Sequence, residues 1–210
     1  MIEYIIAHSP DDRVIENACK ILKRGGIVCL PTDTNWILIA DPTHKDGLEK
    51  LYKIKKENGN KHFSLFVPDI STASEVAFIS DQAFKLLKKV TPGHYTFIFE
   101  AKKRIAKSIK ATKTDKEVGL RFVPSILVET LLKAYGDVVI STNIPPQAIA
   151  GVNEGDEIYS YMIEDSSIKN LIDIIIDPGE IEFAGQSSII SFLGEIPEVV
   201  REGAGDISIF

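Results

Sequence analysis

Hydroxyl and basic side chains recur in this sequence beside short apolar runs that are typical of strands. The stretch CLPTDTNW, residues 29–36, places Thr32, Asp33 and Thr34 between the apolar runs IV and ILIA. Buried polar side chains cost free energy unless they are partnered, so these three side chains need a partner or a ligand. The other polar residues in comparable positions are Lys55, Lys61, Thr96, Arg121, Ser141, Thr142, Ser187, Ser188 and Arg201.

These residue types together suit a small anionic ligand. Serine and threonine hydroxyls donate and accept hydrogen bonds, and lysine and arginine bind phosphate or carboxylate groups. In open α/β sheets, ligands bind just outside the ends of the strands. The set therefore predicts a site for an anion such as a nucleotide, although each residue taken alone is more often part of a turn or a helix cap.

Motifs of several common catalytic sites are absent from the sequence. It has no phosphate-binding P-loop, no Rossmann fingerprint, and none of the patterns CxxC, HExxH and GxSxG. The histidines His8, His44, His62 and His94 lack metal-ligand spacing, so we expect no metal site made only of protein ligands. These patterns single out no catalytic residue.

The elements that must position the polar residues alternate along the chain. Ser9 is predicted to cap a first helix with Pro10 at its first position, and Gly25 and Gly26 are predicted to end it. Strand-like runs alternate with helical patterns early and cluster late in the chain. The sequence therefore predicts one α/β domain over residues 1–210, with helices and a twisted sheet of mixed parallel and antiparallel strands.

Composition and charge limit the classes of function. A hydrophobic content of 44% is ordinary for a globular protein, and no apolar run is long enough to span a bilayer. Cys19 and Cys29 lie in apolar surroundings and are interpreted as packed thiols of a cytoplasmic protein. The net charge is −6, but residues 45–121 hold 17 Lys and Arg against 9 Asp and Glu, which indicates an electropositive face.

The order of several segments resembles the YrdC/YciO family, and two of them, TPGHYTFIF and VVREGAGD, are closer to its YciO branch. The matching segments are GGIVCLPTDTNW, LEKLYKIKK with NKHFSLF, TPGHYTFIF, VGLRF, VVIST, GQSSII and VVREGAGD. The family includes the threonylcarbamoyl-AMP synthases of tRNA modification, so the resemblance implies an open concave cavity for ATP and threonine. Any Mg²⁺ would then be held mainly by the phosphates.

The resemblance also implies roles for individual residues. Thr32, Thr34, Arg121 and Ser187 would hold a threonine-like ligand, with the arginine on its carboxylate. The residues expected to face the nucleotide are Lys55, Lys61, Ser141, Asn143 and Arg201.

The sequence departs from the synthase pattern at three of the positions expected to face the nucleotide. An arginine position reads Glu57, and a serine–any–asparagine triplet reads Asn143 and Pro145 at its first and last positions. A carboxylate near a triphosphate would repel it by roughly 4 kcal/mol at 4 Å and an effective dielectric of about 20. These changes favour a protein that keeps the cavity but not efficient synthase chemistry.

Two functions of different classes remain open. The favoured one is a YciO-like protein that binds nucleotide and double-stranded or tRNA-like RNA, and the alternative is an active threonylcarbamoyl-AMP synthase. The residues predicted to contact RNA phosphates lie in a lysine-rich segment: Lys102, Lys103, Arg104, Lys107 and Lys110. Few aromatic residues interleave them, so sequence readout should be minor. The oligomeric state stays open, and no membrane partner is expected.

Overall fold

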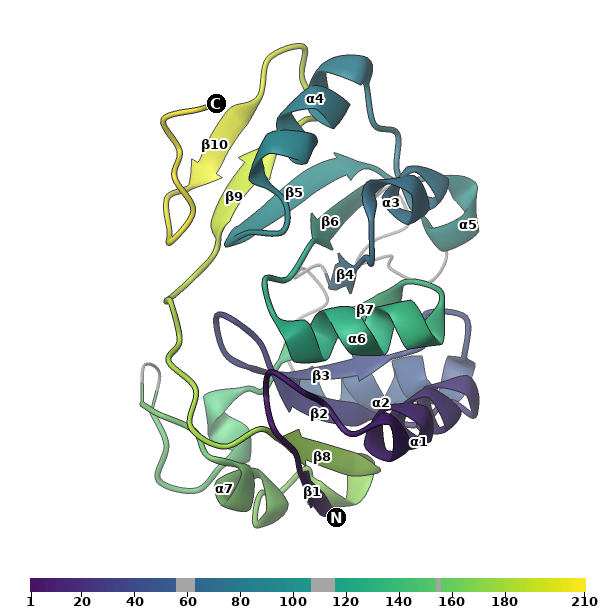
Figure 1. Cartoon of the computed structure of the whole chain (residues 1–210), viewed down its shortest axis with the longest axis vertical. Helices are drawn as coiled ribbons and strands as arrows, with labels where there is room; N and C mark the ends of the chain where they lie inside the picture. Colours follow the sequence, from purple (N-terminus) through teal and green to yellow (C-terminus); the bar gives the residue numbers. More distant parts are fainter. Residues whose placement is uncertain (56–62, 107–115, 154–155) are drawn as a thin grey trace.

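A single mixed sheet runs through the chain from its first strand to its last (Figure 1). The computed structural model describes residues 1–55, 63–106, 116–153 and 156–210. The strands are β1 (Ile2–Tyr4), β2 (Val28–Pro31), β3 (Trp36–Ala40), β4 (Ser64–Phe66), β5 (Tyr95–Glu100), β6 (Glu117–Arg121), β7 (Val139–Asn143), β8 (Ile174–Asp177), β9 (Ser188–Ser191) and β10 (Glu198–Arg201). Their order across the sheet is β1-β8-β2-β3-β7-β4-β6-β5-β9-β10.

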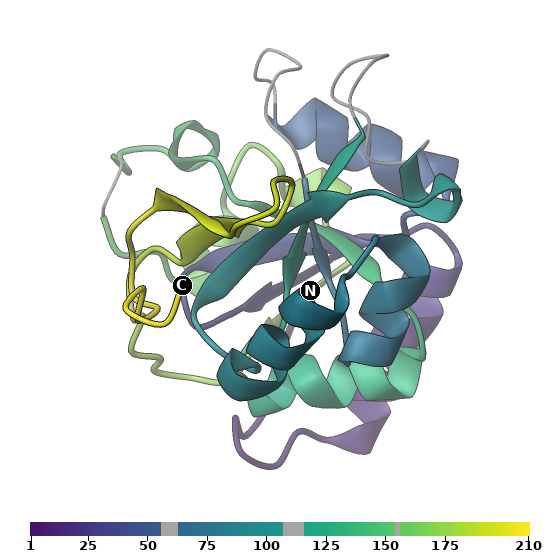
Figure 2. The same ribbon diagram turned by 90° about the horizontal axis from the view of Figure 1, so that it is seen from above.

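The pairing of these strands confirms the predicted mixed α/β sheet. β8 runs parallel to β1 and β2, β4 is parallel to β6, and β5 is parallel to β9. The remaining neighbours are antiparallel. Seen from above, the strands cross one another at changing angles, which is the twist expected of such a sheet (Figure 2).

Helices cover the sheet on both faces. They are α1 (Asp12–Lys23), α2 (Lys45–Lys55), α3 (Ile70–Val76), α4 (Asp81–Val90), α5 (Lys103–Ala106), α6 (Ile126–Tyr135) and α7 (Ser160–Glu164), with short 3₁₀ turns η1 (Pro146–Ala148) and η2 (Lys169–Leu171). α1 and α6 lie side by side in front of the lower half of the sheet, and α2 lies behind it (Figure 1). Among the described residues, no helix is long and apolar enough to cross a membrane.

The first helix begins later than the sequence predicted. Asp11, not Ser9, is its N-cap, and the Asp11 carboxylate accepts a hydrogen bond from the Arg13 backbone N–H at 2.7 Å. Ser9 instead forms a bridge with Ile6 in the segment before the helix. Aspartate and serine are about equally good caps, so the pairing of Ser9 outside the helix decides between them.

Successive side chains along a strand point to opposite faces of the sheet, so the apolar side chains form two separate layers. One core contains side chains of α1 and α6 together with Val28, Ile39 and Val139. The other contains side chains of α2, α3 and α4 together with Phe97 and Leu120. Cys19 and Cys29 are buried free thiols in these two layers, as predicted.

The same alternation decides which polar residues share a face. Leu65, Leu120 and Ile140 belong to the core with α2, so their strand neighbours point to the face that carries α1 and α6. Those neighbours include Ser64, Ser141 and Arg121. Residues from strands far apart in the sequence therefore meet on one face of the sheet.

Candidate functional site

An ion pair between the end of β6 and the β2–β3 turn forms the centre of the site. The Nη2 of Arg121 donates to Oδ1 of Asp33 at 2.7 Å, and its Nη1 donates to Oγ1 of Thr34 at 3.0 Å. The Arg121 side chain is 6% exposed and that of Asp33 is 3% exposed, so the pair is shielded from water. We call Thr32, Asp33, Thr34, His94 and Arg121 the Arg121 cluster.

Thr32 has a structural role within this cluster. Its hydroxyl accepts hydrogen bonds from the backbone N–H groups of Thr34 and Asn35 and donates to the Asn35 carbonyl at 3.0 Å. Its backbone N–H also donates to that carbonyl. These contacts close the turn between β2 and β3, so Thr34 is the threonine that contacts Arg121.

His94 joins the cluster from the residue just before β5. Its Nδ1 lies 2.8 Å from Oδ2 of Asp33, so the two oxygens of this carboxylate hold an arginine and a histidine. The Asp33 carbonyl also accepts the Ala184 N–H at 2.8 Å. The Asp33 carboxylate is thus partnered by residues 61 and 88 positions away in the sequence.

One nitrogen of Arg121 is left without a partner. Among the described residues, its buried Nε makes no hydrogen bond, and the guanidinium lies 5.5 Å from the centre of the Phe66 ring. Burial lowers the pKa of Arg121, Asp33 acts in the opposite direction, and the nearby positive charge of Arg201 lowers it further. A buried donor without an acceptor is costly, and an oxyanion would satisfy it.

A row of hydroxyl groups continues from this cluster across the strands. It consists of Ser64, Thr96, Ser141 and Ser187, which we call the hydroxyl row. Ser141 Oγ donates to the Ser64 carbonyl at 3.0 Å, and the hydroxyls of Thr96 and Ser187 lie 2.9 Å apart. Gly119 lies between Ser64 and Thr96. A Cβ at this position would be 3.3 Å from both the Ser64 hydroxyl and the Thr96 methyl group.

Arg201 is committed to holding the backbone beside Ser187. Its Nε and Nη2 donate to the Ser187 carbonyl at 3.0 and 2.6 Å, and Nη2 also lies 3.2 Å from the Ser187 hydroxyl. Ser188 Oγ accepts the Gly203 N–H and donates to the Gly205 carbonyl. The segment 201–205 therefore fixes the position of residues 187 and 188 within the site.

The remaining residues predicted to contact a nucleotide are less tightly grouped. The Lys55 ammonium lies 4.2 Å from the centre of the Phe63 ring, at the end of α2. Asn143 is exposed at the end of β7, opposite Ile37. Lys61, like Glu57, lies outside the described residues, so its prediction stays open.

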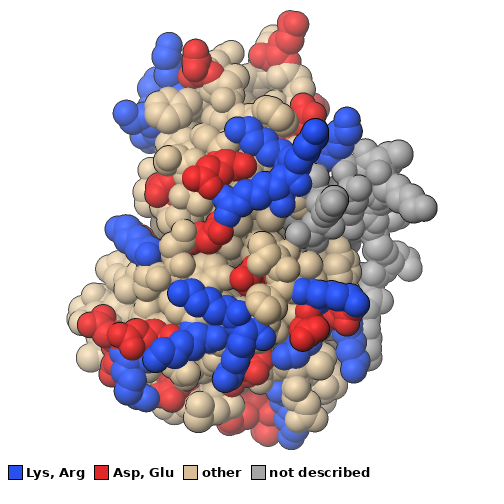
Figure 3. All heavy atoms as spheres, turned by 90° about the vertical axis from the view of Figure 1, so that its right-hand side faces the viewer, with Lys and Arg blue, Asp and Glu red and all other residues tan. Residues whose placement is uncertain are grey.

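The lysine-rich segment is only partly free to meet RNA. Lys102 donates to the Ser74 carbonyl, and Arg104 forms ion pairs with Glu75 and Asp137. Lys103, on α5, is exposed, while Lys107 and Lys110 lie outside the described residues. Figure 3 shows basic side chains spread over this side of the molecule, with acidic side chains among them.

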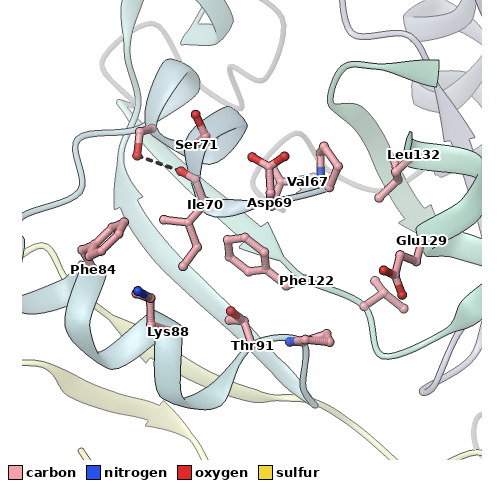
Figure 4. Close-up of a pocket in the computed structure, with 14 residues that line it drawn as sticks. Val67, Asp69, Ile70, Ser71, Phe84, Lys88, Thr91, Phe122, Glu129 and Leu132 are labelled. Carbon is pink, nitrogen blue, oxygen red and sulfur yellow. Dashed lines mark hydrogen bonds between the residues drawn. The ribbon is translucent and has the colours of Figure 1, made fainter. Parts of the chain in front are cut away.

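A separate pocket lies between α3, α4 and α6. Its volume is about 650 Å³, and apolar side chains such as Ile70, Phe84 and Phe122 line it (Figure 4). None of the predicted site residues lines it. Its two carboxylates are engaged, because Asp69 caps α3 and Glu129 pairs with Lys133. The concave cavity implied by the resemblance is therefore not this pocket and stays a prediction.

Comparison with known proteins places the chain in a family. The profile of the Sua5/YciO/YrdC family, described as "Telomere recombination", matches residues 20–203. The chain is 30% identical to the Escherichia coli K12 protein named "Uncharacterized protein YciO" over 210 residues, covering 99% of this chain and 97% of that protein. The chain belongs to the Sua5/YciO/YrdC family.

Other members of the Sua5/YciO/YrdC family share the fold. The crystal structure of E. coli YciO aligns with a TM-score of 0.86 at 29% identity, covering 100% of this chain and 98% of that one. A P. abyssi Sua5 structure described as complexed with L-threonine aligns with a TM-score of 0.81 at 18% identity, covering 97% of this chain and 57% of that one. A "Putative threonylcarbamoyl-AMP synthase" of Methanocaldococcus jannaschii is 26% identical, covering 91% of this chain and 86% of that protein.

Three residues of the site were not among the predicted ligand contacts. Asp33 lies in the β2–β3 turn, and its partners His94 and Arg121 come from distant parts of the sequence. Ser64 is a member of the hydroxyl row that only the strand register reveals. In this Sua5/YciO/YrdC chain, the position of His94 directly before β5 was the sequence feature that could have indicated its place in the site.

Proposed function

We propose that this chain is a YciO-like protein whose Arg121 cluster binds the anionic group of a small ligand, with a threonine-like carboxylate or a nucleotide phosphate as the ligand class. The observation that supports this most is the buried, unpartnered Nε of Arg121, on a guanidinium whose Nη1 donates to the Thr34 hydroxyl. Arginine binds carboxylate and phosphate in a fixed planar geometry. The hydroxyl row supplies neighbouring groups that donate and accept.

ATP and L-threonine are the probes that test this proposal. We expect calorimetry to detect binding of at least one of them to the wild-type chain. Thr34→Val removes a hydroxyl but keeps the buried ion pair. Arg121→Lys keeps the positive charge but loses the planar guanidinium group. We expect either change to weaken binding by roughly tenfold or more.

An exposed arginine provides the matched control for this test. Arg13 is 70% exposed and pairs with Glu3 on the surface, so Arg13→Lys should leave the affinity unchanged. Absence of binding of both ATP and threonine to the folded wild-type chain would contradict the proposed ligand class. Equal binding by wild type and the two cluster variants would place the ligand elsewhere.

Threonylcarbamoyl-AMP synthesis is the second candidate. The similarity to the M. jannaschii protein named a putative synthase favours it, whereas Glu57, Asn143 and Pro145 oppose it by departing from the synthase pattern. We expect little pyrophosphate release from ATP in the presence of threonine and bicarbonate. Turnover at a typical enzyme rate of about 1–10³ per second would establish the synthase instead.

RNA binding is a further part of the proposal and rests on the lysine-rich segment. We expect replacement of Lys103, Lys107, Lys110 and Lys116 by alanine to weaken binding of a duplex RNA and to flatten its salt dependence. Each lost phosphate contact should reduce the slope of log affinity against log salt concentration by about 0.9, a value taken from B-DNA. Filter binding at several salt concentrations measures this slope.

The control for the RNA experiment removes the same charge elsewhere. Lys20, Lys23, Lys133 and Lys169 are exposed on other elements and should tolerate alanine with little change in the slope. An equal loss of RNA affinity in both variants would indicate a general effect of net charge. No binding at low salt would remove RNA from the proposed function.

A further inference from the structure

The Asp33 carboxylate fixes the orientation of His94. A carboxylate can only accept hydrogen bonds, so the Nδ1 that lies 2.8 Å from Asp33 Oδ2 must carry the hydrogen and donate it. The side chain of His94 is 38% exposed while that of Asp33 is 3% exposed, so solvent reaches the ring but not its partner. Among the described residues, Nε2 of His94 makes no hydrogen bond.

We propose that His94 is a second anion-contacting residue of the Arg121 cluster, and that it determines whether the site prefers a doubly or a singly charged oxyanion. With Nδ1–H donated to Asp33, Nε2 of the neutral ring is an acceptor and repels an oxyanion. When the ring is protonated, Nε2 becomes a donor and can bind the oxyanion. This inference rests on the proposed use of the cluster for anions and adds the charge class of the ligand.

The charges around His94 agree with this assignment. The charged groups that act on the cluster are Asp33 from the β2–β3 turn, Arg121 from the end of β6 and Arg201 from the end of β10. One carboxylate against two guanidinium groups leaves a single positive charge while His94 is neutral. Protonation of His94 raises it to two, which matches a dianion such as the phosphate of a nucleotide.

Bound anion and protonated His94 should therefore stabilise each other. Because Nδ1 of His94 is already bonded to Asp33, the ring can contact a ligand only through its other nitrogen, Nε2. In this proposal the unpartnered Nε of Arg121 supplies the other contact, on a guanidinium whose Nη2 is held by Oδ1 of the same Asp33 carboxylate. One carboxylate holds both side chains, through Nδ1 of His94 and Nη2 of Arg121, so their orientation is fixed before a ligand arrives.

Sulfate and methanesulfonate are suitable probes for this receptor. Both keep their charge between about pH 5.5 and pH 8, the range in which a histidine titrates, so a pH effect on binding arises from the protein. They have the same tetrahedral shape but carry two charges and one. We expect sulfate to bind about tenfold more tightly at the lower pH and methanesulfonate to gain much less.

Two neutral replacements test whether His94 causes the effect. His94→Asn can still donate to Asp33 from the position of Nδ1, and His94→Gln places an amide near the position of Nε2. In both variants the preference of sulfate for low pH should fall to about twofold or less, since neither side chain titrates. His8→Asn is the control, because His8 is exposed outside the cluster and should leave the pH dependence intact.

The outcomes separate this inference from the proposed function. Sulfate affinity that is independent of pH in the wild type, or equally dependent on pH in His94→Asn, would overturn the role of His94. If sulfate binding depends on His94 but ATP and threonine both fail to bind, the receptor stands and the proposed ligand class is wrong. If ATP binds with no pH dependence, the proposed function stands without His94.

Discussion

Replacing Gly203 by alanine is expected to lower the free energy of unfolding by about 3 kcal/mol or more. A Cβ at this position would lie 2.3 Å from the Gln186 carbonyl oxygen and 2.6 Å from the Ser187 carbonyl carbon. Both atoms belong to backbone, so no side chain can turn away to relieve the contact. The C-terminal segment would have to separate from residues 186–188, which breaks the hydrogen bond from the Gly203 N–H to Ser188 Oγ.

Urea unfolding followed by circular dichroism measures this loss of stability. Gly194→Ala is the matched control, because the nearest atom to its Cβ would be the Ile196 carbonyl oxygen at 3.6 Å and its change should stay within about 1 kcal/mol. Similar stability of the two variants would show that the C-terminal segment is not packed as described. Gly203→Ala should also weaken anion binding, since it displaces Ser187.

The change Asp33→Asn is expected to destabilise the fold by about 3–5 kcal/mol. It leaves the buried Arg121 guanidinium without its carboxylate, and removal of one partner of a buried ion pair exposes the full desolvation cost of the other. The double variant Asp33→Asn with Arg121→Met removes both charges. It should therefore be more stable than Asp33→Asn alone, and thermal unfolding of the three proteins measures the difference.

A surface ion pair gives the reference for this effect. Glu129 and Lys133 are partners one helical turn apart on α6 with side chains 48% and 66% exposed, so Glu129→Gln should change stability by less than about 1 kcal/mol. A comparably small effect of Asp33→Asn would mean that water reaches Arg121 in solution. In that case the guanidinium would not be held in a fixed position for a ligand.

Elements built from local patterns were predictable from the sequence. Short apolar runs bounded by turn residues predict β3 and β5, and the apolar spacing from Val14 to Leu22 predicts α1. The start of α1 was wrong by two residues because Ser9 and Asp11 are both good caps. The short turn from Ile6 to Ser9 decides between them, because it pairs Ser9 outside the helix.

The candidate site was only partly predictable, for a physical reason. Residue type alone marked Arg121, Thr34 and Ser187 as suitable for an anion, and the structure joins Arg121 to Thr34 and Ser187 to Thr96. Type alone could not show that Arg201 is tied to the Ser187 carbonyl, or that Arg104 is tied to two acids. Those contacts join residues that are separated in the sequence, and the local pattern of residue types does not show which separated residues meet.

The sheet order has a consequence for how the chain acquires its structure. β1 lies at one edge of the described sheet and pairs there with β8, whose residues come more than 170 positions later: Ile2 faces Ile175. β5 likewise waits for β9, where Tyr95 meets Ser188. Pairings between such distant segments require large loops to close and are slow. During synthesis, β1 therefore stays without this sheet partner until residues 174–177 have left the ribosome.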